Sequence, residues 1–422
     1  MTDRPAPAGQ PAPAPIMTAV LTVFLPFAGG YFLSYLYRTV NAVLAPRLVE
    51  ELGIGPADLG LLTAAYFLSF AAFQLPLGVL LDRFGPRRVQ SLLLCFAALG
   101  AFLFSRGEDL TALLAGRALI GFGVAGGLMA SFKAITLWFP RERWALVNGC
   151  FLAMGGLGAL SATAPTEYAL QFLDWRGVFL VLAGLTLLVA FVIFTVSPER
   201  NSGERSSLKE ALKGTGQVFA DRLFWRVVPL SVPIVSFGLA VQGLWIGPYL
   251  GEVAGLEDGT VAGYLFWTAA SLTAGFIIAG FLADRLERIG FSLPSSFFIL
   301  ALLFMGSQVP IVFQWNPEAL WPWVLFALTG NGTAIVFAVL SRHFPMALSG
   351  RASTALNLLV FSGAFATQYA IGAIIELFPA GAQGGGSPLG YKAAFGAFLV
   401  LQALGVLWYL LTARWAPVDS KP

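Results

Sequence analysis

The chain has 422 residues, of which 57% are hydrophobic and only 11% are charged, and its mean hydropathy is +0.78. An ordinary soluble domain carries about 25% charged residues, so this composition excludes a protein whose surface is solvated mainly by water. The net charge of +3 gives no support for a nucleic-acid partner.

Residues 1–16 are rich in Pro and Ala and lack the features of a signal peptide, so they predict a disordered tail. Apolar segments of about 20 residues follow, each long enough to cross a hydrocarbon core of about 30 Å as a helix. Twelve such segments are expected, near residues 17–46, 59–81, 89–105, 110–138, 145–168, 177–197, 226–250, 260–282, 291–313, 320–341, 352–376 and 391–413. The pattern predicts an all-α membrane protein with twelve transmembrane helices.

The first span contains Arg38, within the apolar and aromatic segment YFLSYLYRTVNAVLAP. An arginine at membrane depth costs at least about 2.5 kcal/mol unless it faces a polar cavity or a partner. Two interpretations are open: Arg38 binds substrate, or its side chain extends to the membrane interface near Pro46. We favour substrate binding, because intramembrane charges are functional by default.

A cluster of charged residues and glycines follows the second span, in the segment GVLLDRFGPRRV. Its members are Gly78, Asp82, Arg83, Gly85, Arg87 and Arg88. The glycines permit a close helix approach and a tight turn, and Asp82 can accept hydrogen bonds from the N-terminus of a neighbouring helix. A basic loop that only sets topology would explain the arginines but not the acid and the glycines beside them.

The fourth span holds Arg117, followed by several glycines, and Lys133, about 24 Å further along the helix. The glycines beside Arg117 suit helix packing, and proton coupling, which the family resemblance given below implies for this arginine, is equally open. Lys133 either lines the inner vestibule or extends to the interface. Three cations and no mid-helix carboxylate favour anions in the pathway. Glu167, at the end of the fifth span, is the candidate for any proton coupling.

The charged segment 198–225 divides the spans six and six and predicts a linker with an amphipathic helix on the membrane surface. The halves 17–197 and 226–413 share a motif, since Gly280, Asp284 and Arg285 repeat the spacing of the cluster after the second span. Repeats of this kind predict two pseudo-symmetric six-helix bundles that move about a central site. Residues 414–422 form a short tail.

An even number of spans places both termini on one side of the membrane. Most of the 25 Lys and Arg residues fall on that side, which predicts cytoplasmic termini in a bacterial-type inner membrane.

These motifs resemble those of the major facilitator superfamily over the whole chain apart from the tails. The segment after the second span matches the family signature G-x-x-x-D-R-x-G-R-R, with Pro86 between the last Gly and Arg. The resemblance implies a secondary transporter that works by alternating access as a monomer, with the cluster at residues 78–88 acting as a latch between the halves.

The segment YLYRTVNAVLAP is similar to the first helix of the organophosphate:phosphate antiporter and anion:cation symporter branches of that family. The resemblance implies that Arg38 contacts the anionic group of the substrate, with Tyr35 and Asn41 nearby. Other polar residues on helices that line the family's cavity are Tyr66, Gln74, Gln242, Asn331 and Asn357. Trp245 and Tyr249 are expected in an interfacial aromatic belt.

An enzyme is not expected, because the single histidine, His343, has no paired nucleophile or metal ligands in the sequence. Cys95 and Cys150 have no Cys or His at metal-ligand spacing, so they predict small buried apolar residues and no metal or cofactor.

We therefore predict transport of a small organic or inorganic anion, with or without a coupling ion. Export of hydrophobic or cationic compounds is the alternative, and a membrane sensor without transport or a membrane enzyme is more distant.

Overall fold

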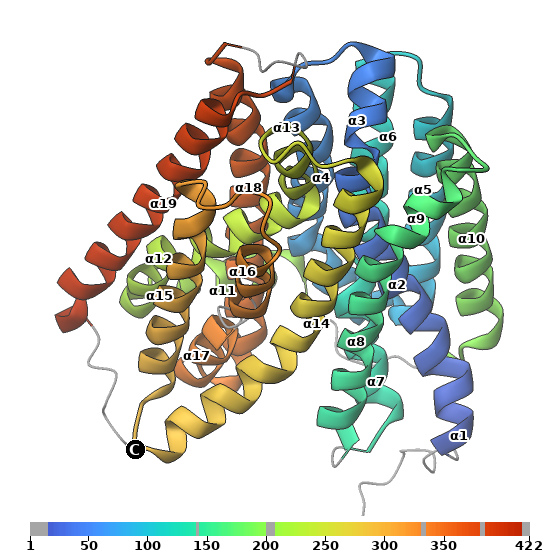
Figure 1. Cartoon of the computed structure of the whole chain (residues 1–422). Coiled ribbons are helices and arrows are strands. Elements are labelled where there is room, and N and C mark those ends of the chain that lie inside the picture. Colours follow the sequence, from blue (N-terminus) through green and yellow to red (C-terminus); the bar gives the residue numbers. More distant parts are fainter. Residues whose placement is uncertain (1–15, 141–142, 200–206, 331–334, 380–384, 416–422) are drawn as a thin grey trace, which may run out of the picture.

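The computed structural model describes residues 16–140, 143–199, 207–330, 335–379 and 385–415, and every regular element within these ranges is a helix (Figure 1). The N-terminal group of helices comprises α1 (Ile16–Ala19), η1 (Val20–Phe24), α2 (Leu25–Thr39), α3 (Asn41–Leu52), α4 (Pro56–Phe84), α5 (Pro86–Arg106), α6 (Leu110–Val124), α7 (Gly127–Trp138), α8 (Trp144–Ser161), α9 (Ala164–Ala169) and α10 (Trp175–Val196). The C-terminal group comprises α12 (Arg222–Ala240), η3 (Val241–Trp245), α13 (Ile246–Glu252), α14 (Asp258–Arg288), α15 (Leu293–Val312), α16 (Trp321–Gly330), α17 (Ile335–His343), α18 (Met346–Glu376), α19 (Pro388–Leu411) and η5 (Ala413–Trp415).

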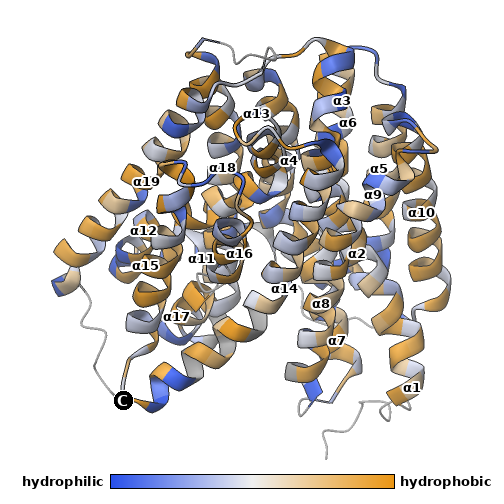
Figure 2. Ribbon diagram, in the orientation of Figure 1, coloured by the Kyte–Doolittle hydropathy of each residue, from blue (hydrophilic) through white to orange (hydrophobic). Residues whose placement is uncertain are grey.

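Ten runs of helix in the described ranges are long and apolar enough to cross a membrane. Each of the twelve expected spans coincides with a helix or a run of helices; α8, with its shorter apolar stretch Leu146–Ser161, and α14 stand at the places of the fifth and eighth. Hydrophobic residues make up most of the length of the helices (Figure 2), and many large ones, such as Leu187 and Phe191, are exposed. This is a multi-pass, all-α membrane protein, as the sequence predicts.

The first expected span is two helices rather than one, because α2 and α3 are separated by a turn at Val40. Pro46 has no backbone N–H, so the carbonyl of Ala42, four residues earlier, has no intrahelical partner. Gly247 of α13 packs against that carbonyl: a Cβ on Gly247 would lie 2.1 Å from the oxygen. The first and seventh spans are therefore packed closely together beside Arg38.

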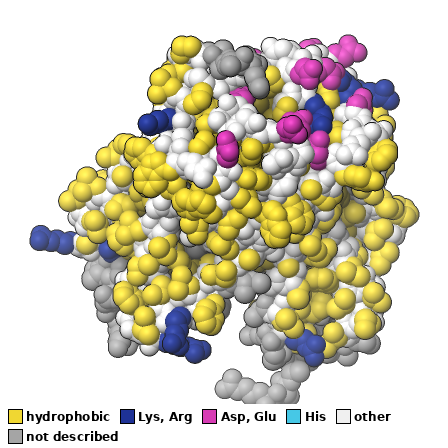
Figure 3. Space-filling view, in the orientation of Figure 1, with side chains coloured by type: hydrophobic (Ala, Val, Ile, Leu, Met, Phe, Trp, Pro, Cys, Tyr) yellow, Lys and Arg dark blue, Asp and Glu magenta, His cyan; other side chains and the backbone are white. Residues whose placement is uncertain are grey.

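The two groups of helices touch along α4 and α18, which run antiparallel. Near the start of α4 the contact is tight, since a Cβ on Gly60 would lie 2.7 Å from the carbonyl oxygen of Gln368, and one on Gly372 would lie 2.2 Å from that of Pro56. Near the end of α4, a Cβ on Gly78 would meet open space. We call the side of α3 and α13 the closed side and the side of α7 and α17 the open side. Figure 3 shows a notch between the groups at the open side.

The predicted linker contains helix α11 (Leu208–Phe219), which begins with a capping box. The Ser207 N–H donates to the Glu210 carboxylate (3.0 Å), and this bond lowers the pKa of Glu210 from its ordinary value. The helix packs against α4, α12 and α18, and a Cβ on Gly214 would lie 2.2 Å from Cδ of Arg351. The linker helix is therefore docked on both groups at the open side.

Two expectations about burial are wrong. Trp245 and Tyr249 are 0% and 1% exposed and belong to the core of the C-terminal group, not to an interfacial belt. Tyr249 packs against Trp323 and donates a hydrogen bond to the Ile311 carbonyl (3.2 Å), so its polar end is satisfied without water. Cys95 and Cys150 are exposed and unpaired rather than buried.

Candidate functional site

Arg38 lies in the last turn of α2 and is only 8% exposed. Its guanidinium carbon lies 4.6 Å from the ring centre of Tyr35, 5.4 Å from that of Phe361 and 5.7 Å from that of Phe70. These are cation–π distances. The rings come from α2, α18 and α4, so both groups of helices surround the same charge. The side chain is buried rather than extended to the interface.

Arg38 makes no ion pair with any described carboxylate, and its Nε is buried without a hydrogen-bond partner. A buried charge without a counter-ion is costly. A guanidinium offers a planar fork of donors that matches a carboxylate or another oxyanion. The arrangement can therefore bind an anion between the two groups of helices.

Two of the predicted binding residues lie around Arg38, and a third lies on the same face of α18 as Phe361. Tyr35 supplies the nearest ring, and the hydroxyl of Tyr66 donates to the carbonyl of Ser34 (3.2 Å), one turn before Arg38. Asn357 is half-buried on α18, one turn from Phe361 and on the same face.

Three others have side chains directed elsewhere. Asn41 Nδ2 donates to Thr63 Oγ1 (2.9 Å), on the closed side of Arg38. Gln74 Nε2 lies 3.5 Å from the carbonyl of Ala125, inside the N-terminal group, and so is directed away from the contact between groups. Gln242 lines a cavity of about 30 Å³ between the groups, together with Thr39. Asn331 lies outside the described residues.

No signal in the sequence indicated Phe70 and Phe361, which complete the site. Phenylalanine is common in the apolar spans of this chain, which has 37 of them, and no spacing distinguishes these two. Their role follows from the approach of α4 to α18, where their ring centres lie 4.2 Å apart.

Arg117 is fully buried within the N-terminal group. Its Nη1 donates to the backbone carbonyl of Tyr37 (2.9 Å), and its guanidinium lies 5.4 Å from the ring of Phe104 and 5.7 Å from that of Phe179. This is the geometry of packing against the first span, one of the two interpretations of the sequence. Arg117 fixes the backbone directly before Arg38.

Lys133 on α7 pairs with Asp82 on α4, with 2.7 Å between Nζ and Oδ1. Both residues belong to the N-terminal group, so in this conformation the signature acid is bound within its own half. The pair leaves Lys133 partly exposed at the open side, with 22% of its side chain accessible.

The other predicted gating residues lie at the open ends of the helices. Gly85 has φ +79° at the turn between α4 and α5, a conformation that favours glycine. Arg87 and Arg88 approach Glu199 at 3.9 and 3.3 Å. Gly78, Arg83 and Arg285 are exposed. The exposure of Gly280 and the side chain of Asp284 lie outside the described part of the structure.

Glu167 on α9 forms two hydrogen bonds with Arg47 of α3, at 2.7 and 3.0 Å. Asp258, at the start of α14, lies 4.0 Å from the same guanidinium. The candidate for proton coupling is thus held in an ion pair on the closed side, next to a carboxylate of the C-terminal group. The sequence did not single out Arg47, because its partner is 120 residues away.

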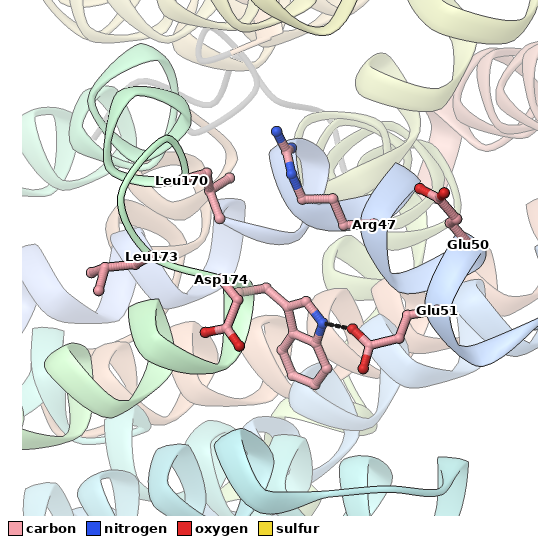
Figure 4. A pocket seen from close by; sticks show the side chains of 7 residues that line it. Arg47, Glu50, Glu51, Leu170, Leu173 and Asp174 are labelled. Carbon is pink, nitrogen blue, oxygen red and sulfur yellow. Dashed lines mark hydrogen bonds between the residues drawn. The ribbon is translucent and has the colours of Figure 1, made fainter.

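A surface cavity of about 460 Å³ also lies on the closed side (Figure 4). It is lined by Arg47, Glu50, Glu51, Leu170, Leu173, Asp174 and Trp175. Trp175 Nε1 donates to Glu51 (2.5 Å), which also pairs with Arg176. Acidic side chains gather on this edge of the molecule (Figure 3), so the cavity disfavours anions.

A family model and several relatives of known or probable function match this chain. A family model described as Major Facilitator Superfamily matches residues 27–368. The D-galactonate transporter of Escherichia coli O6:H1 is 25% identical over 404 residues, 89% of this chain and 92% of that protein. The probable sulfoacetate transporter of Cupriavidus necator is 28% identical over 279 residues, 61% of this chain and 63% of that protein. A probable nitrate/nitrite antiporter of Thermus thermophilus is 29% identical over 58% of this chain and 56% of its own length. The chain thus aligns with less than two thirds of the last two relatives.

Two solved structures are similar in fold. A bacterial homologue of the human lysosomal transporter Spinster, described as inward-facing and unoccupied, superposes with a TM-score of 0.75 at 18% identity, over 95% of this chain and 98% of its own. A D-xylose–proton symporter gives a TM-score of 0.75 at 15% identity, over 97% of this chain and 100% of its own.

Proposed function

The chain belongs to the Major Facilitator Superfamily, and we propose that it carries a small anion across the membrane by alternating access, with Arg38 binding the anionic group. It is a multi-pass membrane transporter rather than an enzyme. The observation that carries the proposal is the burial of Arg38 between α2, α4 and α18 without a carboxylate partner in the described part of the chain. The names of the relatives, which include galactonate, sulfoacetate and nitrate transporters, support an anion. Export of cationic compounds is not favoured, because the same charge repels cations.

The two groups of helices, residues 17–197 and 226–413, act as the moving bodies, joined by the linker at 198–225. The tight packing of Gly60 and Gly372 on one side and the open space at Gly78 on the other support an inward-facing state, provided that the open side is cytoplasmic. In this proposal both termini are cytoplasmic, the protein works as a monomer in the inner membrane, and Asp82 exchanges Lys133 for a partner on α18 when the open side closes.

A thermal-shift assay on the detergent-purified full chain tests whether the protein binds an anion. The ligands are D-galactonate, sulfoacetate, nitrate and a lipophilic cation. A ligand at about 100 times its Kd adds about 2.7 kcal/mol to the stability of the state it binds. One class of anion should raise the unfolding temperature of the wild type but not of Arg38→Gln.

Arg106→Gln is the matched control, because Arg106 is an exposed arginine at the end of α5. It should respond to the anion as the wild type does. Stabilisation by the lipophilic cation alone, or an undiminished anion response in Arg38→Gln, would overturn the proposal.

A further inference from the structure

Gln368 on α18 is 0% exposed, and neither its Nε2 nor its Oε1 has a hydrogen-bond partner among the described residues. Burying an amide in this way costs free energy that a partner would recover. Buried carboxamides in folded proteins are normally satisfied. The side chain of Gln368 therefore lacks a partner in this conformation.

The residue lies at the contact that seals the closed side. It follows Phe361 by seven residues on the same face of α18, about 10 Å further from the open side. Its backbone carbonyl accepts from Trp245 Nε1 (3.3 Å) and packs against Gly60 of α4. Gln368 is thus enclosed by the same helices, α4 and α18, whose rings enclose Arg38.

Separation of α4 from α18 on the closed side would expose Gln368 on the route from solution to Arg38. The Asn41–Thr63 pair lies beside that route, since Thr63 is one turn from Gly60 on α4. A polar lining of this kind serves no purpose in the sealed contact, where apolar side chains would pack at lower cost. It serves a solute that passes when the contact opens.

Gln90 provides an internal comparison. Its carboxamide is also 0% exposed with both polar atoms unpaired, yet it packs against Gly30 and Gly126, all within the N-terminal group. Relative movement of the two groups does not uncover it. The position of Gln368, and not its unpaired state alone, is what connects it with the substrate path.

The hydrogen-bonding groups of a carboxamide restrict the chemical class of solute that Gln368 can bind. It carries two N–H donors and a carbonyl acceptor. An anion without hydrogen-bond donors, such as nitrate or fully ionised sulfoacetate, can accept from the N–H groups but leaves the carbonyl unpaired. A hydroxyl group both donates and accepts, so it satisfies both ends.

We propose that Gln368 binds hydroxyl groups of the substrate as it enters from the closed side, so that the transported anion is a hydroxylated organic acid of the sugar-acid type. This inference rests on the proposed function, in which Arg38 holds the anionic group. Gln368 then acts as a specificity-determining residue that favours hydroxylated anions over donor-free ones of similar charge.

The test measures KM for counterflow into proteoliposomes that contain the purified full chain. The hydroxylated probes are D-galactonate and L-galactonate, and the donor-free probes are sulfoacetate and nitrate. The variants are Gln368→Met, which keeps the length of the side chain, and Gln90→Met as the matched control. Thermal unfolding of each ligand-free variant checks that it folds.

Gln368→Met should raise KM for the hydroxylated probe about tenfold, the loss of one or two hydrogen bonds. It should leave KM for any transported donor-free probe within about twofold, and Gln90→Met should change neither. An equal change for both kinds of probe in Gln368→Met, or the same selective change in Gln90→Met, would make the residue structural and overturn the inference.

The wild type separates this inference from the proposed function. If it transports sulfoacetate or nitrate but neither galactonate, the hydroxyl inference is wrong while the anion carrier stands. If it transports none of the four anions, both are wrong.

Discussion

Arg38 and Arg47 lie nine residues apart, on the consecutive helices α2 and α3, and their surroundings differ completely. Arg47 donates two hydrogen bonds to Glu167, and Asp258 approaches it from the other group of helices. Arg38 has three aromatic rings and no described carboxylate. The charge of Arg47 is neutralised by the protein, whereas the charge of Arg38 is left for a ligand to neutralise.

The energetics of the two positions differ in the same sense. The side chains of Arg47 and Glu167 are 29% and 17% exposed, so solvent screens the pair and its contribution is about 0–1 kcal/mol. Arg38 is buried at a cost that no described ion pair offsets. A residue retained at such a cost, between the two groups of helices, is best explained by binding.

The largest expected effect follows from removing the unpaired charge. Arg38→Gln should lower kcat/KM for anion transport at least about a hundredfold, or about 2.7 kcal/mol. It should not lower the unfolding temperature of the ligand-free protein, because no ion pair is broken. Transport assays in proteoliposomes and thermal unfolding measure the two quantities.

Arg47→Gln is the contrasting variant. It leaves Glu167 without its partner, so the unfolding temperature should fall while KM stays within about threefold of the wild type. If both variants lose transport equally, the division between a structural and a ligand-binding arginine fails.

The next largest effect concerns closure around the site. Gly60→Val places side-chain atoms where even a Cβ would lie 2.7 Å from the Gln368 carbonyl, so the closed side cannot seal. Turnover should fall at least about tenfold, and a cysteine introduced as Gln368→Cys, in a chain without Cys95 and Cys150, should react faster with a maleimide.

Gly78→Ala tests the other end of α4, where the added methyl meets open space in this conformation. Its effect on labelling at position 368 should be small. Equal labelling rates in Gly60→Val and the parent would show that the two helices are not in contact there.

A smaller effect is expected at the start of α4. The N-cap residue, Gly55, has no side chain, and the backbone N–H of Ala57 instead donates to Glu376 of α18 (3.3 Å). A carboxylate at a helix N-terminus contributes about 0.3–1 kcal/mol. Glu376→Gln should therefore increase maleimide labelling at position 368 about two- to fivefold, with little change in the unfolding temperature. Slower labelling in Glu376→Gln would contradict the view that the hydrogen bond from Ala57 to Glu376 stabilises the contact between α4 and α18.

The smallest effect is expected for the exposed ion pair at the open side. Lys133 and Asp82 are 22% and 24% exposed, so a double-mutant cycle with Lys133→Met and Asp82→Asn should give a coupling energy of about 0.2–0.5 kcal/mol in thermal stability. Additive losses would show that the two charges do not interact in the dominant conformation.

The candidate site was only partly predictable. Arg38 and Tyr35 stand out because a charge in an apolar segment is rare and its neighbours in sequence share its helix. The polar residues chosen from other helices were less well placed: Gln74 points into the N-terminal group, and Trp245, expected at the interface, is fully buried in the core. Side-chain direction around a long apolar helix depends on which neighbours pack against it, and a sequence in which most faces are apolar carries little periodicity to reveal this.

The sequence by itself determined the all-α membrane fold and the positions of the charges along the spans, because hydropathy and helix length are local properties of the chain. Only the tertiary structure decided which of those charges have partners. Arg47 meets Glu167 across 120 residues, Lys133 meets Asp82 across 51, and Arg38 meets the ring of Phe361 from the other half of the chain. The same is true of Gln368, whose isolation appears only when α18 packs against α4. Such pairings depend on the approach of distant helices, and their energies are set by burial that no single segment encodes.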